Sequence, residues 1–394
     1  MWQQQKGWAM QRQPTEEHRA DVRRRLAALR AAMATDGVSA FLGVAQGAPG
    51  MGGILRYFTN VELWAGRAFL LATLDDEDPL VVMWSNYGAE WAKQMATTSR
   101  VVSTIQEQRP PVARVIDELS RIVRPGQRVG VANLNTVLSL TEYRAMTDAL
   151  PGVEFADFTA QVNAIRQIKS PFEIKAMEET GAILVGALEA FGEAARPGVP
   201  AWEAAAEAER YAKTRGCFWG RSKYSLDQRP FTIPAPIDRR LRQDDVILFE
   251  MVYQGPLGYW HEITCVYSFG PLPDEVGRRL EAWQEAVRAA AAVARPGVPF
   301  GEIGRAADRT LRELGYTVIG KHTPDCHSIG TDEADGVTPP PADELLRENM
   351  VLSFHPASLL EGGYAFLISD NYQITPQGGR VLSPLGRPYR QLKA

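Results

Sequence analysis

Residues 193–210 read EAARPGVPAWEAAAEAER, and residues 292–309 read AVARPGVPFGEIGRAADR. Each stretch has the pattern of a helix, an RPGVP break and a second helix, because proline and glycine interrupt helical structure. The two copies are an internal repeat. We therefore expect the second half of the chain to be built from two related halves.

The sequence on either side of the first copy predicts the neighbouring elements. Ser170 and Pro171 are suitable N-cap and first-turn residues for a long helix that leads into the repeat. Residues 217–242, rich in Arg, Pro and Asp, are predicted to form a polar loop. The apolar segments 245–254 and 258–270 then form a predicted strand pair with a short turn between them.

The first half of the chain alternates between helical and extended patterns. Helices are predicted at 16–35 and 111–123, and buried strands at 38–44, 69–74 and 79–85. This alternation favours an α/β domain. We place it at residues 1–163 and a second domain at residues 164–394.

Composition limits the classes of protein. The chain has 394 residues, 45% of them hydrophobic, so two globular domains are expected. A formal net charge of -4 argues against a nucleic-acid partner. No apolar run reaches the roughly 18 residues of a membrane span, and the first residues lack a signal-peptide core. We expect a cytoplasmic protein.

The three cysteines do not suggest a disulfide framework or a zinc site. Cys217, Cys265 and Cys326 are widely spaced and include no CxxC pair. We expect them to be buried apolar residues.

Several motifs resemble the creatinase, prolidase and aminopeptidase P superfamily of metallopeptidase family M24. They are IRQIKSPFEIKAM at 165–177, the two RPGVP breaks, GYWHEIT at 258–264 and, in the first half, GVSAFLGV and ILRYFTN. The resemblance covers nearly the whole chain. It implies a creatinase-like α/β N-terminal domain and an α+β pita-bread C-terminal domain with two pseudo-symmetric halves. It also implies a homodimer.

The family has a metal site of two aspartates, one histidine and two glutamates. The resemblance places these positions, in chain order, on Glu250, Glu262, His327, His355 and Ser369. Only the histidine, His327, is retained. Glu250, Glu262, His327 and His355 could hold one manganese, iron or zinc ion, whereas Ser369 is a poor ligand. Because creatinase itself works without metal, we favour a metal-free pocket and keep a one-metal site as the alternative. No organic cofactor is expected.

The family's assisting residues also differ here. Its two assisting histidines correspond to the region of Ile233 and Pro234 and to Ala334, and its arginine corresponds to Cys265. Without those imidazoles, a proton shuttle near neutral pH is missing or has moved. Ordinary Xaa-Pro peptidase activity is therefore doubtful.

The residues by themselves suggest charge compensation. Glu250 and Glu262 lie on consecutive predicted strands and can face each other across a hairpin, or one of them can point to solvent. Two facing carboxylates need a metal ion, a shared proton or a cationic substrate. His261 and Glu262 point to opposite faces of a strand, so His261 is expected to pack elsewhere unless a bulge reverses the choice. The same alternation separates Ser369 from Asp370.

The histidines have two interpretations. His327 is predicted in a loop and His355 at the end of an apolar strand, where a buried imidazole is often a hydrogen-bonded core group. Together with the two glutamates, either histidine can instead act as a general base. The preceding loop carries Arg221, Lys223, Tyr224 and Arg229, which either select an anionic group of the substrate or are only solvated.

We therefore expect an M24-like enzyme that hydrolyses a carbon–nitrogen bond in a small amide, amidine or dipeptide-like molecule. Catalysis is assigned to Glu250, Glu262, His327 and His355. The alternatives are a hydrolase with a remodelled one-metal site and an inactive pseudo-peptidase that acts as a binding protein.

Overall fold

The computed structural model describes residues 13–48, 50–226, 239–336 and 340–392. The described residues form two compact units, one up to Arg166 and one from Gln167 onward. The boundary expected after residue 163 lies in helix α6 (Thr159–Gln167), which also contains this division. Among these residues no helix is both long and apolar enough to cross a membrane.

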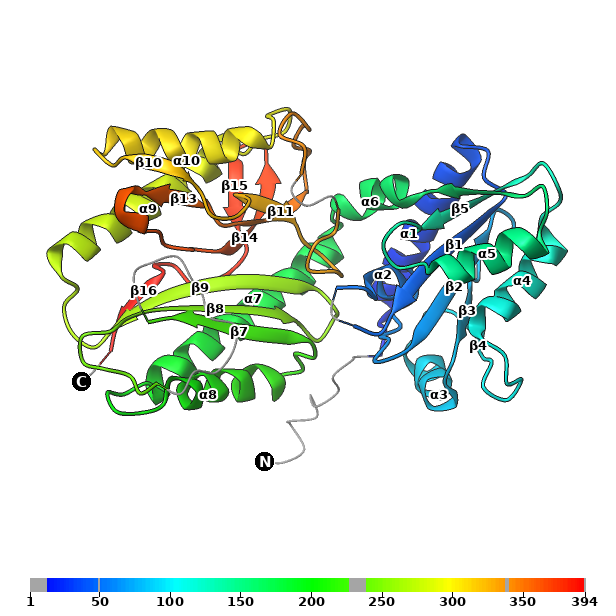
Figure 1. Cartoon of the computed structure of the whole chain (residues 1–394), viewed down its shortest axis with the longest axis horizontal. Helices are drawn as coiled ribbons and strands as arrows, with labels where there is room; N and C mark the ends of the chain where they lie inside the picture. The colour runs from blue at the N-terminus through cyan, green and yellow to red at the C-terminus, as the bar shows by residue number, and fades with distance from the viewer. Residues whose placement is uncertain (1–12, 49, 227–238, 337–339, 393–394) are drawn as a thin grey trace. The chain divides into compact units, whose positions relative to one another are not determined.

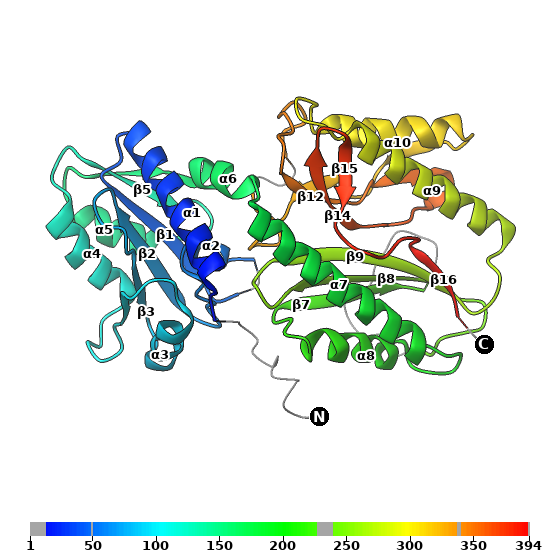
Figure 2. The ribbon, with the colours of Figure 1, turned by 180° about the vertical axis from the view of Figure 1, so that it is seen from behind.

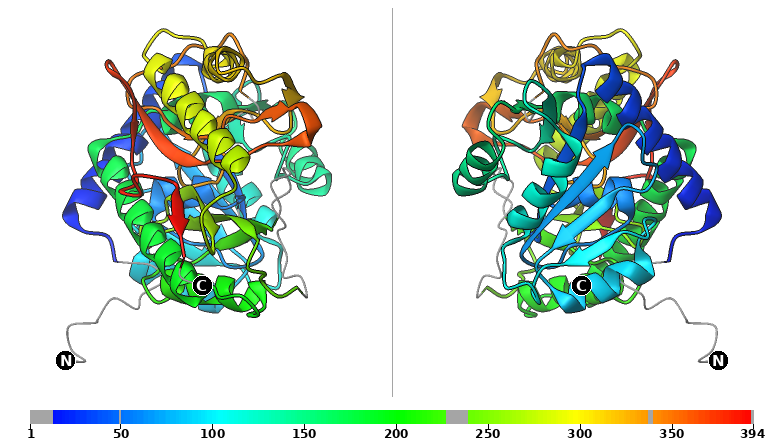
Figure 3. Two further views of the ribbon diagram at one scale, coloured as in Figure 1. Left: turned by 90° about the vertical axis from the view of Figure 1, so that its left-hand side faces the viewer. Right: turned by 90° about the vertical axis from the view of Figure 1, so that its right-hand side faces the viewer.

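The N-terminal unit is a mixed sheet covered by helices on both faces, as Figure 3 shows in its right-hand view. The strand order is β4-β3-β2-β1-β5-β6. The strands are β1 (Ala40–Gln46), β2 (Arg67–Thr73), β3 (Leu80–Met83), β4 (Val101–Ser103), β5 (Arg128–Ala132) and β6 (Glu154–Asp157). The helices besides α6 are α1 (Glu16–Thr35), α2 (Gly53–Thr59), α3 (Asn86–Met95), α4 (Pro111–Ile122) and α5 (Leu140–Ala149). The α/β architecture predicted for this half is present.

Alternation along β1 explains the two layers. Phe41 packs in the core on the side of α1 and α2, whereas Leu42 and Val44 pack in the core on the side of α4. Every residue of β1 except Gln46 is buried, as expected for a strand covered on both faces.

The C-terminal unit consists of two halves, each with a helix pair and a four-stranded sheet (Figure 1). The first half has α7 (Pro171–Ala194), α8 (Ala201–Lys213), β7 (Gly220–Ser225), β8 (Val246–Gln254) and β9 (Trp260–Ser268), with β16 (Tyr389–Gln391) added to its sheet. The second half has α9 (Asp274–Val293), α10 (Gly301–Glu313), β11 (Cys326–Ser328), β12 (Val351–Phe354), β14 (Asp370–Thr375) and β15 (Gly378–Val381). A two-stranded sheet of β10 (Val318–Lys321) and β13 (Ser358–Leu360) and the 3-10 helix η2 (Glu361–Gly363) complete it.

The RPGVP breaks join the helices of each pair. Gly198 and Gly297 have φ values of 89° and 84°, which glycine adopts without the steric cost that a side chain would bring. At the other end of α7, Ser170 accepts a hydrogen bond from the main-chain N–H of Glu173, and the Glu173 side chain completes a capping box. The predicted start of α7 and the predicted internal repeat are both confirmed.

The hairpin of β8 and β9 is the centre of this unit. Both strands are buried along their whole length. One face packs against α7 and α8, which Figure 2 shows beside the strands, in an apolar cluster that includes Phe191, Phe249 and Tyr267. The opposite face is turned toward the sheet of the second half and carries the polar residues of the site.

Two predictions of local structure were wrong. Residues 220–225, predicted as loop, form β7, which pairs with β8 from Gly220 to Ser225. His327, predicted in a loop, lies in the short strand β11. The charged composition of β7 and the three-residue length of β11 give weak strand signals, and pairing with neighbouring strands decides the outcome.

Candidate active site

Glu250 and Glu262 extend from one face of the β8–β9 hairpin. Glu250 lies opposite Thr264, and Glu262 lies opposite Val252, so the two glutamates are diagonal neighbours across the pair. Their exposed fractions are 1% and 4%. The face-to-face placement that the sequence allowed is therefore present, in a buried setting.

Hydrogen bonds of main-chain and side-chain groups hold this hairpin against the second half. The Thr264 N–H donates to the Ser369 carbonyl at 3.0 Å, and the Ser369 N–H donates to Thr264 Oγ1 at 3.2 Å. The side chain of Asn371 accepts from the Glu262 N–H at 3.3 Å and donates to the Trp260 carbonyl at 3.2 Å. These bonds hold β9 along the start of β14.

His327 forms an ion pair with Glu262. Its Nε2 lies 3.2 Å from Glu262 Oε1, and its Nδ1 lies 3.0 Å from the Ser328 carbonyl. Because both ring nitrogens face acceptors, this geometry favours the doubly protonated imidazolium. Burial lowers the pKa of His327, but the charge and hydrogen bond of Glu262 and the Ser328 carbonyl outweigh it and raise the pKa to about 9.

Glu262 is fixed by a second hydrogen bond. Ser353 Oγ donates to Glu262 Oε2 at 2.7 Å, from the residue of β12 that lies opposite His327. Burial by itself would raise the pKa of Glu262, but His327, His355 and the Ser353 hydroxyl hold it well below its usual range. Glu262 is thus the ionised partner of His327.

His355 directly follows β12 and lies beside this pair, with a ligand atom within 4.8 Å of those of Glu262 and His327. The ring centroids of His355 and His327 are 5.3 Å apart. In the part of the chain that the structure describes, the buried Nδ1 of His355 has no hydrogen-bond partner. Burial, followed by the positive charge of His327, lowers the pKa of His355 to about 4 against the opposing effect of Glu262. His355 is therefore a neutral imidazole at pH 7.

The counter-charge of Glu250 comes from a lysine and not from a histidine. Lys223, directly opposite Glu250 in the β7–β8 ladder, forms an ion pair with its carboxylate. Ser369 Oγ donates to Glu250 Oε1 at 3.1 Å. Burial raises the pKa of Glu250, and Lys223 opposes that rise. Lys223 and His327 therefore supply the compensation that two buried carboxylates need.

Of the four residues predicted to bind substrate, two lie on the face that carries the glutamates. Arg221 shares this face with Lys223 and forms a bidentate pair with Glu333, with Nη1 2.6 Å from Oε2. Tyr224 lies on the opposite face, opposite Phe249 and within the apolar core. Arg229 is outside the described residues. The structure thus brings Arg221 and Lys223 to the site and does not bring Tyr224 there.

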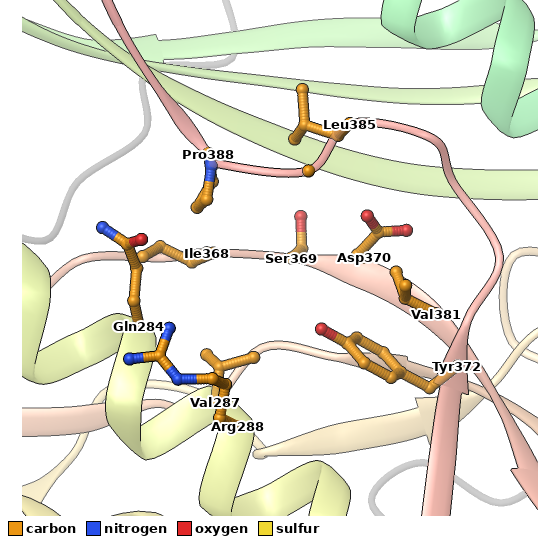
Figure 4. Close-up of a pocket in the computed structure, with 11 residues that line it drawn as sticks. Gln284, Val287, Arg288, Ile368, Ser369, Asp370, Tyr372, Val381, Leu385 and Pro388 are labelled. Atoms are coloured by element: carbon orange, nitrogen blue, oxygen red, sulfur yellow. The ribbon is translucent and has the colours of Figure 1, made fainter.

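His261 points away from the two glutamates, as alternation predicts. His261 Nδ1 lies 3.2 Å from the Met177 carbonyl, and His261 Nε2 lies 3.0 Å from Asp370 Oδ1. Asp370 also accepts from the Ser383 hydroxyl. Figure 4 shows Ser369 and Asp370 side by side, lining a cavity of about 150 Å³ with Tyr372 and Gln284. Ser369 thus lies between this cavity and Glu250.

Sequence reasoning missed three functions of residues in this site. Lys223 was expected either to select an anionic group or to be solvated, and the loop predicted for residues 217–242 gave no reason to pair it with Glu250. Ser353 and Thr264 were not considered. Since Ser353 is two residues before His355, and Thr264 two residues after Glu262, the period of two along a strand could have placed both on the site face.

The donor set fits one divalent ion and not two. Glu262, His327 and His355 each offer one ligand atom, and these atoms lie within 4.8 Å of one another. One carboxylate and two imidazoles are a suitable set for zinc, manganese or iron. A second ion would have to bind at Glu250, which is already paired with Lys223 and has the Ser369 hydroxyl beside it. A dinuclear centre does not fit these residues.

The positions of the assisting residues are partly described. Ala334 carries no titratable group, and Ile233 and Pro234 lie outside the described residues. The two imidazoles of the site are therefore His327 and His355.

The chain matches known families over most of its length. The model of Metallopeptidase family M24 matches residues 175–376, and that of the Creatinase/Prolidase N-terminal domain matches residues 25–168. A putative dipeptidase, YkvY, of Bacillus subtilis is 24% identical over 259 residues, covering 62% of this chain and 68% of the relative. An ectoine hydrolase of Halomonas elongata is 25% identical over 303 residues, covering 70% of this chain and 74% of the relative.

Solved structures share the fold. The prolidase from Pyrococcus horikoshii OT3 has a TM-score of 0.75 and 19% identity, over 92% of this chain and 99% of that one. An Xaa-Pro dipeptidase from Bacillus anthracis has a TM-score of 0.76 and 19% identity, over 95% of this chain and 100% of that one. The creatinase-like N-terminal domain and the pita-bread C-terminal domain predicted from the sequence are confirmed.

Proposed function

This chain belongs to metallopeptidase family M24, and from that premise we propose that it hydrolyses a carbon–nitrogen bond of a small molecule by acid/base chemistry without metal. Its relatives include dipeptidases and an ectoine hydrolase, so it is an M24-type hydrolase. The small-molecule substrate and the metal-free chemistry are the parts that we add.

The observation that carries the proposal is the pairing of two unlike imidazoles. His327 lies between two acceptors, Glu262 and the Ser328 carbonyl, whereas His355 has a buried ring nitrogen without a partner in the described chain. Neighbouring titratable groups whose environments separate their protonation states are typical of acid/base sites. The Lys223 pair at Glu250 supports the proposal, because it removes one carboxylate from the set that could bind metal.

Each residue then has a distinct step. Neutral His355 takes a proton from water as the water oxygen forms a bond to the substrate carbon. The His327 imidazolium stabilises the negative charge that develops on the substrate oxygen or nitrogen. This stabilisation is stronger in a buried site than in water, because little solvent screens the charge. His355 returns its proton to the leaving nitrogen as the carbon–nitrogen bond breaks. Glu262, fixed by Ser353, keeps His327 charged and oriented.

A single-ion alternative is favoured by the same three residues. Glu262, His327 and His355 would hold one divalent ion, which when bound supplies Lewis-acid activation of water. In that case His355 would be a ligand and could not serve as the base. A chelator therefore distinguishes the two forms of the site: it should abolish the activity of the single-ion form and leave that of the metal-free form unchanged.

Arg221 is the residue that we propose to bind a substrate carboxylate. Its guanidinium already binds the Glu333 carboxylate in bidentate fashion, and 40% of its side chain is exposed. A substrate carboxylate of the same geometry can replace Glu333. This favours amino-acid derivatives, including amides, cyclic amidines and dipeptides, as substrates.

The proposal predicts hydrolysis that continues after metal has been removed. The protein is treated with a chelator and dialysed, and small amides, cyclic amidines and Xaa-Pro dipeptides are assayed for release of amine. We expect kcat/KM on the best substrate to be unchanged by the chelator. It should rise with pH through about 4, as His355 becomes neutral, and fall through about 9, as His327 loses its charge. Activity that disappears with the chelator and returns with one divalent metal would support the single-ion alternative instead.

The homodimer remains a prediction, and so does the cytoplasmic location. Trp64, Trp84 and Tyr87 of the N-terminal unit have exposed fractions of 48%, 41% and 93%. Exposed aromatic side chains of this kind are common at contacts between subunits, which supports the prediction of a dimer.

A further inference from the structure

We propose that Lys223 is a built-in cation that occupies the place beside Glu250 which a small external cation would otherwise take, and that removing its ammonium opens a cation site there. The inference depends on the proposed function for its part in catalysis. Its test measures binding and needs no substrate.

The first argument is burial. Glu250 is 1% exposed in the middle of β8, where an isolated ionised carboxylate would be very unfavourable. The structure places the Lys223 ammonium on this carboxylate, from the directly opposite residue of β7. Only 21% of the Lys223 side chain is exposed, so the pair is shielded from most of the solvent. Glu250 therefore depends on Lys223 for its counter-charge.

The second argument is the chemistry of the surroundings. Ser369 Oγ lies 3.1 Å from Glu250 Oε1, and Thr264 Oγ1 lies 2.6 Å from Ser369 Oγ. Glu262, a second carboxylate, lies on the same face. These donors are all oxygens, which suit an ammonium or a hard divalent cation such as Mn²⁺.

The third argument is exclusion. Two cations at one carboxylate repel each other strongly in a buried site. While Lys223 holds Glu250, a divalent ion is confined to the part of the site formed by Glu262, His327 and His355. Lys223 therefore limits how many ions the site can take, and it positions Glu250 as an anion.

The test uses Mn²⁺ alone, titrated calorimetrically into the full-length wild type, Lys223→Ala, Lys223→Arg and the double variant Lys223→Ala/Glu250→Gln. We expect Lys223→Ala to bind one more Mn²⁺ than the wild type, or to bind it at least about tenfold more tightly. Lys223→Arg, which keeps the charge, should behave as the wild type. The double variant should lose the gain, because the new site needs the Glu250 carboxylate. Methylammonium, a mimic of the lost group, should raise the melting temperature of Lys223→Ala and not that of the wild type.

Lys169→Ala is a matched control. Lys169 is also buried and lies 3.1 Å from Asp335 in the same unit, where it pairs with a different carboxylate. This variant measures the Mn²⁺ binding that follows from losing any buried ammonium, and the gain in Lys223→Ala should exceed it, because Glu250 has the Ser369 hydroxyl beside it and Glu262 on the same face. If Lys223→Ala does not fold, Lys223→Met keeps most of the apolar stem and is titrated in its place.

A folded Lys223→Ala or Lys223→Met variant without added cation binding would overturn the inference, as would a gain that persists in the double variant. Failure of the proposed function gives a different result. Stoichiometric metal in the wild type that is lost in His355→Ala would contradict metal-free chemistry, but the additional ion of Lys223→Ala would still be expected.

Discussion

Replacing Glu262 with glutamine is expected to lower the pKa of His327 from about 9 to below its ordinary value of 6.5. The reason is that burial then acts on His327 without the opposing carboxylate. In the wild type, folding raises the pKa of His327 from 6.5 to about 9. This rise corresponds to about 3 kcal/mol of stability, since each pKa unit is worth about 1.4 kcal/mol. The change should be visible in imidazole resonances followed by NMR over a pH titration.

The loss of stability should depend on pH in a defined direction. The pKa of His327 is raised on folding, so its contribution is complete below pH 6.5 and disappears as pH rises through about 9. The free energy of unfolding of Glu262→Gln should therefore lie furthest below that of the wild type at mildly acidic pH below 6.5, and the gap should narrow as pH rises toward 9. Ser353→Ala is the control, because it removes the hydrogen bond at Oε2 and keeps the charge. A His327 pKa still above 8 in Glu262→Gln would contradict this account.

Replacing His355 with alanine should have the largest effect on catalysis. Loss of a general base typically lowers the rate by about 10²–10⁴-fold. We expect that fall in kcat on the best substrate, with little change in KM, because His355 acts on water and Arg221 binds the substrate. The acidic limb near pH 4 should also disappear from the pH profile of the residual activity.

The control for this variant is His322→Ala. His322 is a partly buried histidine that lies outside the cluster, so its removal should leave kcat close to that of the wild type. If His355→Ala keeps activity within about threefold of the wild type, well short of the loss expected for a general base, His355 is not the base.

The sequence predicted most of the fold because its signals are local and strong. The RPGVP breaks at Gly198 and Gly297, the Ser170 cap and the helix α1 were all identified correctly. The sequence left open whether Glu250 and Glu262 face each other or one of them points to solvent, and the register of β8 and β9 decides for the first arrangement. His261 was assigned to the opposite face from Glu262 because successive residues of a strand alternate, and it contacts Asp370.

The remaining features depend on pairing between segments that are far apart in the sequence. Lys223 reaches Glu250 only because β7 pairs with β8, and nothing in the local sequence GRSKYS fixes that register. Tyr224 was grouped with Arg221 and Lys223 as a binding residue. It directly follows Lys223 in β7, so its side chain lies on the opposite face of the strand, in the apolar core. The protonation states of His327 and His355 could not be predicted either, since they follow from the distance of each ring to Glu262 and from burial.

The most direct test of the central claim is elemental analysis of the purified wild type and of His355→Ala, after dialysis against trace mixed divalent metals. Our account predicts no near-stoichiometric metal in either protein, since Glu262 is paired with protonated His327 and Glu250 with Lys223. Near-stoichiometric manganese, iron or zinc in the wild type that drops in His355→Ala would contradict it. That result would establish His355 as a metal ligand and favour the single-ion site of Glu262, His327 and His355.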